Sequence, residues 1–267
     1  MYNHFQLGVK YLQYFFTASN GRGHGIHSPF IFQFVEQVLL PSYKNKAVFN
    51  NIENIRHAYK AEKNRFLEVD DLGAGSVSKS GSRRSIAQIA NGAAKHPKFA
   101  RLLHRLVEYY EVASVLELGT SLGLTTRYLA LAGEGVRIQT IEGAPAIADF
   151  SRKAFEQEGL DNITLLVGDF DLKLPEALSK MTGKKLFFFD GNHQYQPTVR
   201  YFEEVVRSCG EEDILVFDDI HWSKGMENAW EEIKKNERVS CSVDLFFIGI
   251  VFLRKEFKEK LDFTIRF

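Results

Sequence analysis

Glu117-Leu-Gly-Thr-Ser-Leu-Gly123 is the most informative segment of this chain for its fold class. It ends a short apolar run at residues 113–118 and leads into a helical pattern at residues 124–132. Gly119 allows a tight turn and a close approach of the backbone to a ligand, and Gly123 permits contact between helix and strand. A glycine loop between a strand and a helix N-terminus is typical of a ligand-binding α/β domain.

Strand and helix patterns alternate along the rest of this region. Apolar strands are predicted at residues 113–118, 136–141, 163–167, 186–189 and 214–217, with amphipathic helices between them. This alternation indicates a parallel sheet with helices on both faces. The β-rich runs 239–247 and 248–253 leave no room for a helix between them and predict an antiparallel hairpin. The expected fold is α/β, with a Rossmann-like, doubly wound, mostly parallel seven-stranded sheet.

The first part of the chain differs from this pattern. We expect residues 1–98 to form a helical N-terminal cap and residues 99–267 to form the α/β domain. The Gly- and Ser-rich segment 70–84 contains a second glycine pattern, Asp71-Leu-Gly-Ala-Gly-Ser76, but no apolar helix follows it. We interpret it as a cap loop that closes over a ligand. The compact run His24-Gly-Ile-His-Ser-Pro-Phe30 leads into a helix, and its role does not follow from its residues.

Composition excludes several classes of protein. The 267 residues include 34 Lys and Arg against 34 Asp and Glu, so the chain has no basic excess for binding nucleic acid. Cys209 and Cys241 have neither zinc-site nor disulfide-framework spacing, and we expect both to be buried and reduced. No stretch resembles a signal peptide or spans a bilayer, so the cytoplasm is the expected location and no membrane contact is predicted.

An aromatic stripe lies near the N-terminus. It consists of Phe5, Tyr11, Leu12, Phe15 and Phe16. Such a stripe predicts a core face or a subunit interface, with membrane contact a distant second. A homodimer is therefore left open.

The spacing of the glycine loop separates it from dinucleotide-binding loops. The pattern is E-x-G-x-x-x-G, so Ser121 stands where a pyrophosphate would approach a glycine, and Glu117 would repel a phosphate. Such a loop suits a cofactor that has an amino-acid cation and no phosphate. Here the sequence resembles the class I S-adenosylmethionine-dependent methyltransferases.

Further acids stand at the ends of the next two strands. Glu142 and Gly143 end the second strand, where an acid can accept hydrogen bonds from ribose hydroxyls. Asp169 and Phe170 end the third, and the resemblance implies that they contact the adenine. Strand-end acids can also simply cap the following helices. The predicted contacts of S-adenosyl-L-methionine are Glu117, Gly119, Thr120, Ser121, Gly123, Thr125, Glu142, Gly143, Asp169, Phe170 and Asp190.

Carboxylates also follow the fourth and fifth strands. Asp190, Asp218 and Asp219 should converge, and three close carboxylates require a cation, for which Mg²⁺ is expected. This set is similar to that of the metal-dependent O-methyltransferases related to catechol O-methyltransferase, which have an Asp and then an Asp-Asn pair. Their general base is a lysine three residues after the first Asp, where this chain has His193. Asp219 in place of Asn, and His193 in place of Lys, argue against a catechol substrate.

These patterns predict an enzyme that methylates a small-molecule hydroxyl from S-adenosyl-L-methionine, with divalent-metal assistance. Asp190 and His193 are the predicted catalytic residues, with His193 taking the proton of the hydroxyl. Asp190 can instead contact the cofactor with no metal present, and His193 can be a structural histidine. An aminopropyltransferase and an inactive, cofactor-binding regulatory protein are the alternatives. The acceptor itself cannot be read from the sequence.

Overall fold

The computed structural model describes residues 1–19, 28–40, 47–69 and 82–267. The chain divides into two compact units, which are described separately below. One consists of residues 43–183 and the other of residues 1–42 together with 184–267. The loop at 71–76 and the histidines at 24 and 27 lie outside the described residues.

The unit of residues 43–183 contains the glycine loop. Its elements are α3 (Ala47–Ala61), β1 (Phe66–Val69), β2 (Ser82–Ser85), α4 (Ile86–Ala93), α5 (Pro97–Tyr109), β3 (Ser114–Leu118), α6 (Leu124–Ala130), β4 (Arg137–Glu142), α7 (Pro145–Glu158), β5 (Ile163–Val167) and α8 (Phe170–Ser179). Strand β4 pairs in parallel with both β3 and β5, and helix α8 contacts all three strands. Strands β1 and β2 form a separate antiparallel pair.

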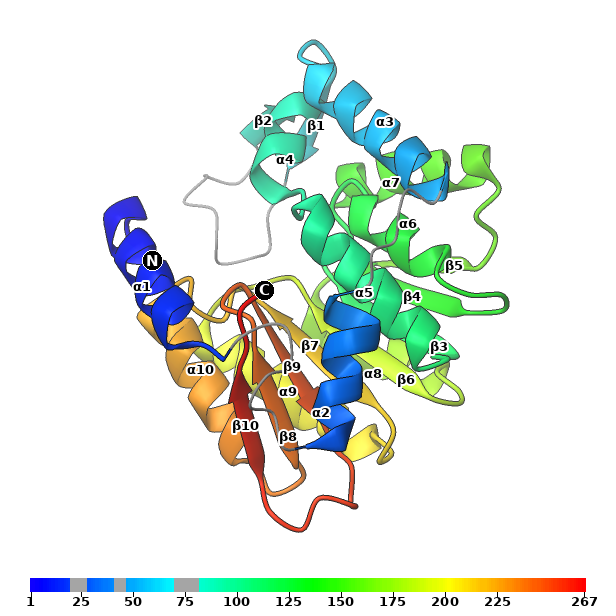
Figure 1. Ribbon diagram of the computed structural model, residues 1–267. Helices are drawn as coiled ribbons and strands as arrows, with labels where there is room; N and C mark the ends of the chain where they lie inside the picture. Colours follow the sequence, from blue (N-terminus) through cyan, green and yellow to red (C-terminus); the bar gives the residue numbers. More distant parts are fainter. Residues whose placement is uncertain (20–27, 41–46, 70–81) are drawn as a thin grey trace. The chain divides into compact units, whose positions relative to one another are not determined.

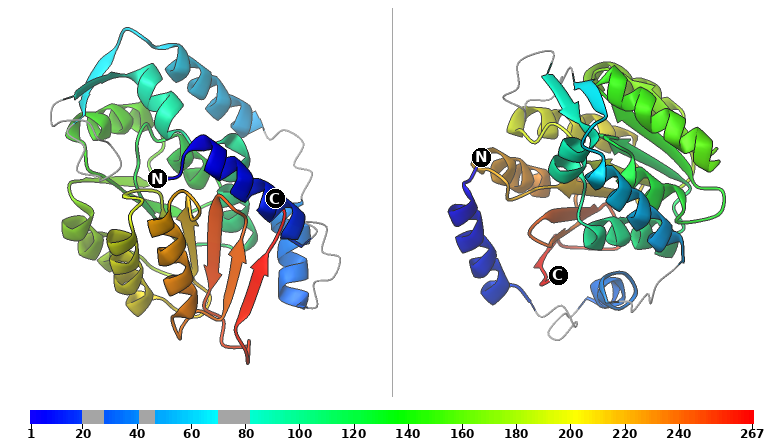
Figure 2. Two further views of the ribbon diagram at one scale, coloured as in Figure 1. Left: turned by 90° about the vertical axis from the view of Figure 1, so that its left-hand side faces the viewer. Right: turned by 90° about the horizontal axis from the view of Figure 1, so that it is seen from above.

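The second unit contains both termini of the chain (Figure 2). Its elements are α1 (His4–Thr17), α2 (Pro29–Phe34), a π-helical turn (Val35–Leu39), β6 (Lys185–Phe189), α9 (Tyr195–Ser208), β7 (Ile214–Asp218), α10 (Lys224–Lys235), β8 (Cys241–Asp244), β9 (Ile248–Phe252) and β10 (Leu261–Thr264). Strand β7 is parallel to β6 and antiparallel to β9.

The main sheet follows the order β10-β8-β9-β7-β6-β3-β4-β5 and is flanked by helices (Figure 1). The predicted C-terminal hairpin is confirmed, since β8 and β9 pair antiparallel. The sheet has eight strands where seven were expected, because β10 adds to the edge in parallel with β8. Strand β10 was not predicted, although its four residues alternate between half-buried and exposed positions as edge strands do.

Local signals in the sequence fix the ends of several helices. Pro145 is the first residue of α7, and Gly159 ends it in the left-handed conformation with φ of 67°. The short helical pattern at residues 175–180 predicts only part of helix α8, which already begins at Phe170. Asp169 caps its N-terminus, accepting a hydrogen bond from the Asp171 N–H at 2.7 Å, and Pro175 lies inside it.

The region predicted as a helical cap also contains strands. Strand β2 begins at residue 82, inside the segment predicted to be a loop, and pairs with β1 from Phe66↔Ser85 to Val69↔Ser82. Within the described ranges, no helix is both long and apolar enough to span a membrane.

Candidate functional site

The glycine loop connects β3 to α6 through three residues with positive φ. Gly119, Ser121 and Gly123 have φ of 107°, 48° and 68°. The N–H groups of Gly119 and Thr120 both donate to the carbonyl of Ile141 in β4, at 3.0 and 3.2 Å. The turn is therefore held against the neighbouring strand, and a non-glycine residue, Ser121, occupies a conformation that side chains rarely adopt.

Glu117 lies beneath the loop and is fully buried. Its Oε2 accepts hydrogen bonds from the hydroxyls of Thr126 at 2.6 Å and Thr140 at 2.7 Å. Its Oε1 is buried without a hydrogen-bond partner among the described residues. Burial raises the pKa of this carboxyl from 4.5 to about 7, and the two hydroxyls oppose the shift. A cationic donor from a ligand would satisfy Oε1 and favour the ionised form.

Glu142 joins the end of β4 to the glycine loop. Its Oε2 accepts from the Ser121 N–H at 2.8 Å, and its Oε1 accepts from the Ala144 N–H at 3.0 Å. A carboxylate can accept about four hydrogen bonds in all, which makes this kind of side chain suited to binding a diol. The structure thus positions Glu142 beside the loop, and its binding of a ribose stays a prediction.

The other predicted cofactor contacts lie around these two acids. Thr120 Oγ1 is 2.7 Å from Thr140 Oγ1, and Thr125 is buried in the first turn of α6. Asp169 caps α8, the alternative role for a strand-end acid, and Phe170 is the first residue of that helix. Asp190 belongs to the other unit.

Arg127 stabilises the loop from below and was not singled out in the sequence. Its Nη1 donates to the carbonyls of Leu122 and Gly123 at 3.0 and 2.8 Å. Its Nε and Nη2 donate to the two carboxylate oxygens of Glu158 at 2.8 and 2.6 Å. This buried guanidinium therefore ties the glycine loop to the C-terminal end of α7.

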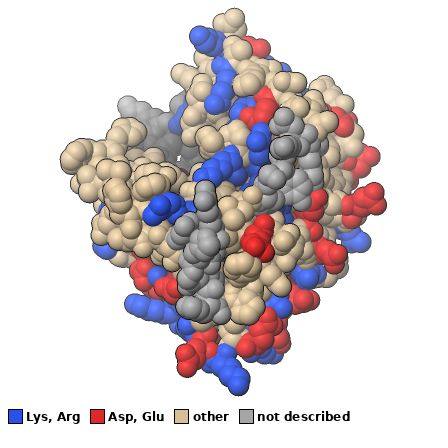
Figure 3. Space-filling model, in the orientation of Figure 1, with Lys and Arg blue, Asp and Glu red and all other residues tan. Residues whose placement is uncertain are grey.

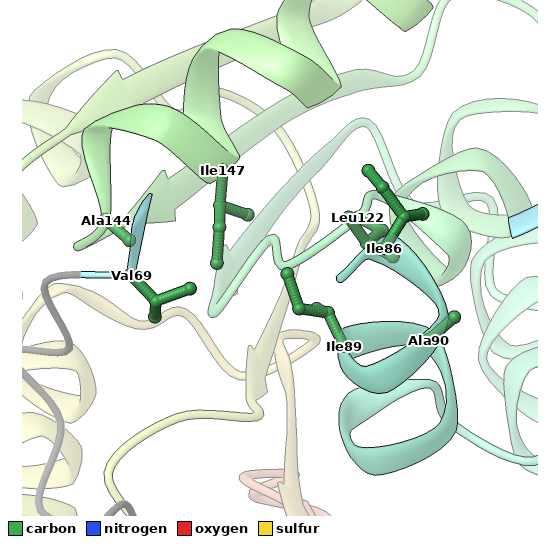
Figure 4. Close-up of a cluster of buried hydrophobic side chains, with 7 residues drawn as sticks. All are labelled: Val69, Ile86, Ile89, Ala90, Leu122, Ala144 and Ile147. Atoms are coloured by element: carbon green, nitrogen blue, oxygen red, sulfur yellow. The ribbon is translucent and has the colours of Figure 1, made fainter. Parts of the chain in front are cut away.

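An apolar cluster supports the same loop (Figure 4). Leu122 from the loop and two residues after β4 pack with β1 and α4, and the cluster consists of Val69, Ile86, Ile89, Ala90, Leu122, Ala144 and Ile147. Elements from residues 66–93 thereby share one core with the glycine loop, although they precede it in the sequence.

The other unit brings together an imidazole and two carboxylates. Asp190, His193 and Asp218 each offer a ligand atom, and these atoms all lie within 4.8 Å of one another. The register of β6 and β7 explains the proximity of the two carboxylates. Phe189 pairs with Phe217, so the next residue of each strand lies at the same edge.

Asp219 is not a member of this set, although the sequence predicted it as a ligand. It has φ of 53°, and its N–H donates to the carbonyl of Phe247 at 2.7 Å. Neither Asp218 nor Asp219 caps α10, because Ser223 does so by accepting from the Met226 N–H. The side chains of His193 and Asp190 are half-buried, whereas Asp218 is buried.

The set has the chemistry of a divalent-cation site. A buried carboxylate next to a second carboxylate is destabilised by desolvation and repulsion unless a positive charge is close. Carboxylates suit Mg²⁺ and Mn²⁺, and an imidazole also suits Zn²⁺ and Fe²⁺. These residues therefore fit a divalent ion.

Comparisons with known proteins agree with this geometry. Residues 116–220 match the model of a methyltransferase domain. The protein-L-isoaspartate O-methyltransferase of Methanococcoides burtonii is 31% identical over 81 residues, which are 30% of this chain and 40% of the relative. The corresponding enzyme of Methanocella arvoryzae is also 31% identical over 81 residues, 43% of its length. The chain thus matches less than half the length of these curated relatives.

Solved structures are similar over much more of the chain. A Podospora anserina methyltransferase with bound S-adenosylhomocysteine has a TM-score of 0.58 at 12% identity, covering 96% of this chain and 98% of that one. The Bacillus cereus O-methyltransferase in complex with S-adenosylhomocysteine has a TM-score of 0.52 at 21% identity, covering 83% of this chain and 96% of that one. The chain has the Rossmann-like methyltransferase fold. In this fold Glu117, Glu142 and Asp169 stand at the carboxyl ends of β3, β4 and β5.

Proposed function

We propose that this protein is an S-adenosyl-L-methionine-dependent methyltransferase that methylates a hydroxyl of a small molecule. The buried Glu117 with its unpaired Oε1, under a glycine loop that Glu142 holds in place, is the observation that carries the proposal. The methyltransferase domain at residues 116–220 supports it.

The cofactor supplies a methyl group on a sulfonium, and residues of the 43–183 unit bind it. Glu117 accepts a hydrogen bond from the ammonium group of the methionine part, and Glu142 accepts from the ribose hydroxyls. The loop N–H groups and the N-terminus of α6 would attract the carboxylate of the cofactor. Gly143, Asp169 and Phe170 would contact its adenine.

A divalent cation supplies positive charge that lowers the pKa of an acceptor hydroxyl. Asp190 and Asp218 hold this ion, and His193 beside them takes the proton from the hydroxyl. A histidine suits this step because imidazole can be neutral near pH 7. The acceptor is a small molecule, the location is the cytoplasm, and Mg²⁺ is the first ion to test.

Calorimetric titration of S-adenosylmethionine and S-adenosylhomocysteine into the full chain tests cofactor binding. We expect micromolar binding that is lost in Glu142→Ala and retained in Glu134→Ala, an exposed glutamate of the same unit. Absence of binding to the unmodified protein would refute the proposal. Mass spectrometry of acceptors then distinguishes an added methyl group from the aminopropyl group of the alternative enzyme.

The metal site has its own test, which does not depend on turnover. Titration of Mg²⁺ and Mn²⁺ should show one site that Asp218→Asn weakens at least about tenfold and the exposed control Asp161→Asn leaves unchanged. His193→Gln separates two roles. If His193 is the base, metal affinity stays and the rise of activity with pH disappears; if it is a ligand, metal affinity falls as well.

A further inference from the structure

Helix α1 is fixed to its own unit by one face. Tyr14 is buried, and its hydroxyl donates to the carbonyl of Ile265 at 2.5 Å. Lys10 pairs with Glu227 of α10 at 2.7 Å. Tyr11 packs edge-on against Phe246 at a centroid distance of 5.1 Å. The helix is thus attached beside α10 and β10 (Figure 1) through these three contacts.

The opposite face of α1 is apolar and exposed. Phe5, Val9, Leu12 and Phe16 are 80%, 50%, 56% and 77% exposed. Their spacing of four, three and four residues places them in one row along the helix, as in the seam of a two-helix contact. The sequence predicted a core or interface stripe here, and the structure divides it, because Tyr11 faces inward and Phe5, Leu12 and Phe16 face outward.

The exposed face carries no ionised side chain from α1. Lys10 is the only Lys, Arg, Asp or Glu in the helix, and it pairs with Glu227 on the inward side. In Figure 3 the surface formed by α1 is accordingly mostly tan. A helix that lies on an anionic membrane typically has a face rich in Lys and Arg. An identical uncharged stripe, in contrast, can pair with this one without repulsion between like charges.

The area of the stripe suits a stable contact between two copies. With Met1 and Phe15, the exposed apolar area is on the order of 600–900 Å², taking roughly 150–250 Å² for a whole large side chain. Two such faces reach the range for specific interfaces, about 1,200–2,000 Å² in total.

Gly8 also favours a second copy of the chain as the partner of this face. It lies on the exposed side of α1, and a Cβ added there would meet no atom within 4 Å. The helix would be more stable with alanine by roughly 0.5–1 kcal/mol, so the described fold gives no packing reason for glycine. A bare backbone next to the stripe allows a second helix to approach closely.

We propose that the Phe5–Val9–Leu12–Phe16 face of α1 is the interface of a homodimer, in which it packs against the same face of a second copy. The contact is isologous, since each copy contributes the same row of side chains. The proposal is independent of the methyltransferase activity, because none of these residues belongs to the predicted cofactor or metal contacts.

Light scattering after size exclusion tests the oligomeric state of the full chain over a dilution series. We expect a dimer that Leu12→Glu converts to a monomer, because a charge would be buried at the centre of the seam. The neighbouring change Gln13→Glu adds the same charge beside the stripe and should leave the dimer intact. Circular dichroism and thermal unfolding of both variants verify that the fold is retained.

A second measurement locates the contact. Cys209 and Cys241 are buried, and burial raises the pKa of each thiol to about 12, so both are inert to mild oxidation. Leu12→Cys should therefore form a cross-linked dimer, whereas Gln13→Cys should form much less. A monomer at all concentrations, a dimer unaffected by Leu12→Glu, or a monomer that binds anionic phosphatidylserine vesicles would each overturn the proposal.

Discussion

At the scale of single residues, Glu117 is a fully buried carboxyl beneath the glycine loop. Burial raises its pKa to about 7 in the folded chain, against 4.5 for the ordinary carboxyl. As the pH rises, the Glu117 carboxyl therefore loses its proton at a lower pH in the unfolded chain than in the folded chain. The stabilising contribution of the protonated form is complete below pH 4.5 and is lost as the pH rises through about 7.

Glu117→Gln should remove this dependence. We expect the wild type to lose on the order of 3 kcal/mol of unfolding free energy relative to the variant across this range, measured by urea denaturation at several pH values. Parallel curves for the two proteins would contradict the assignment. S-adenosylhomocysteine should bind the wild type more tightly as the pH rises and Glu117 ionises, and the variant should lack this trend.

Gly123 occupies a position where both the backbone conformation and a close neighbouring side chain favour glycine. It has φ of 68°, and an added Cβ would lie 2.3 Å from Cζ of the buried Phe155. Gly123→Ala should therefore destabilise the chain by about 1–3 kcal/mol and weaken cofactor binding. Gly133→Ala is the matched control, since its Cβ meets nothing within 4 Å. Equal midpoints in urea for both variants would show that this contact is absent.

At the scale of secondary-structure elements, Arg127 connects α6, α7 and the glycine loop. Arg127→Met would remove the donors to two loop carbonyls and leave Glu158 without its cation. Because Glu158 is 28% exposed, the expected loss is about 2–4 kcal/mol, somewhat below that for a fully buried pair. The exposed Arg137→Met serves as the control. A loss of unfolding free energy below about 0.5 kcal/mol would show that the Arg127–Glu158 pair contributes no more than an ordinary surface salt bridge.

At the scale of the whole molecule, ligand binding should stabilise the fold by mass action. At a concentration of S-adenosylhomocysteine about 100 times its Kd, we expect a gain of roughly 2.7 kcal/mol, which corresponds to about 5–10 °C in Tm. Scanning calorimetry measures the shift, and NAD serves as the control because Glu117 and Ser121 disfavour a pyrophosphate. An equal shift with NAD would instead indicate a dinucleotide site.

Much of the α/β order was predictable from the chain alone. Residues 163–167 form a strand with the predicted bounds, and α7 begins at Pro145 and ends before Gly159, because apolar runs, proline and glycine act locally. The edge strand β10 and the β1–β2 pair were missed, since short strands depend on a partner distant in sequence. The pattern likewise gave no sign of the extension of α8 back to Phe170.

The glycine loop, the acids at the ends of three successive strands and the lack of a phosphate-binding spacing are local features that can be found in the chain alone. Which of these groups meet depends on the fold. Register across β3 and β4 places Thr140 at Glu117, and register across β6 and β7 places Asp190 beside Asp218 while Asp219 is outside the set. Burial of Glu117, and the outward orientation of Phe5, Leu12 and Phe16 in the aromatic stripe, likewise depend on packing between segments far apart in sequence, which periodicity cannot encode.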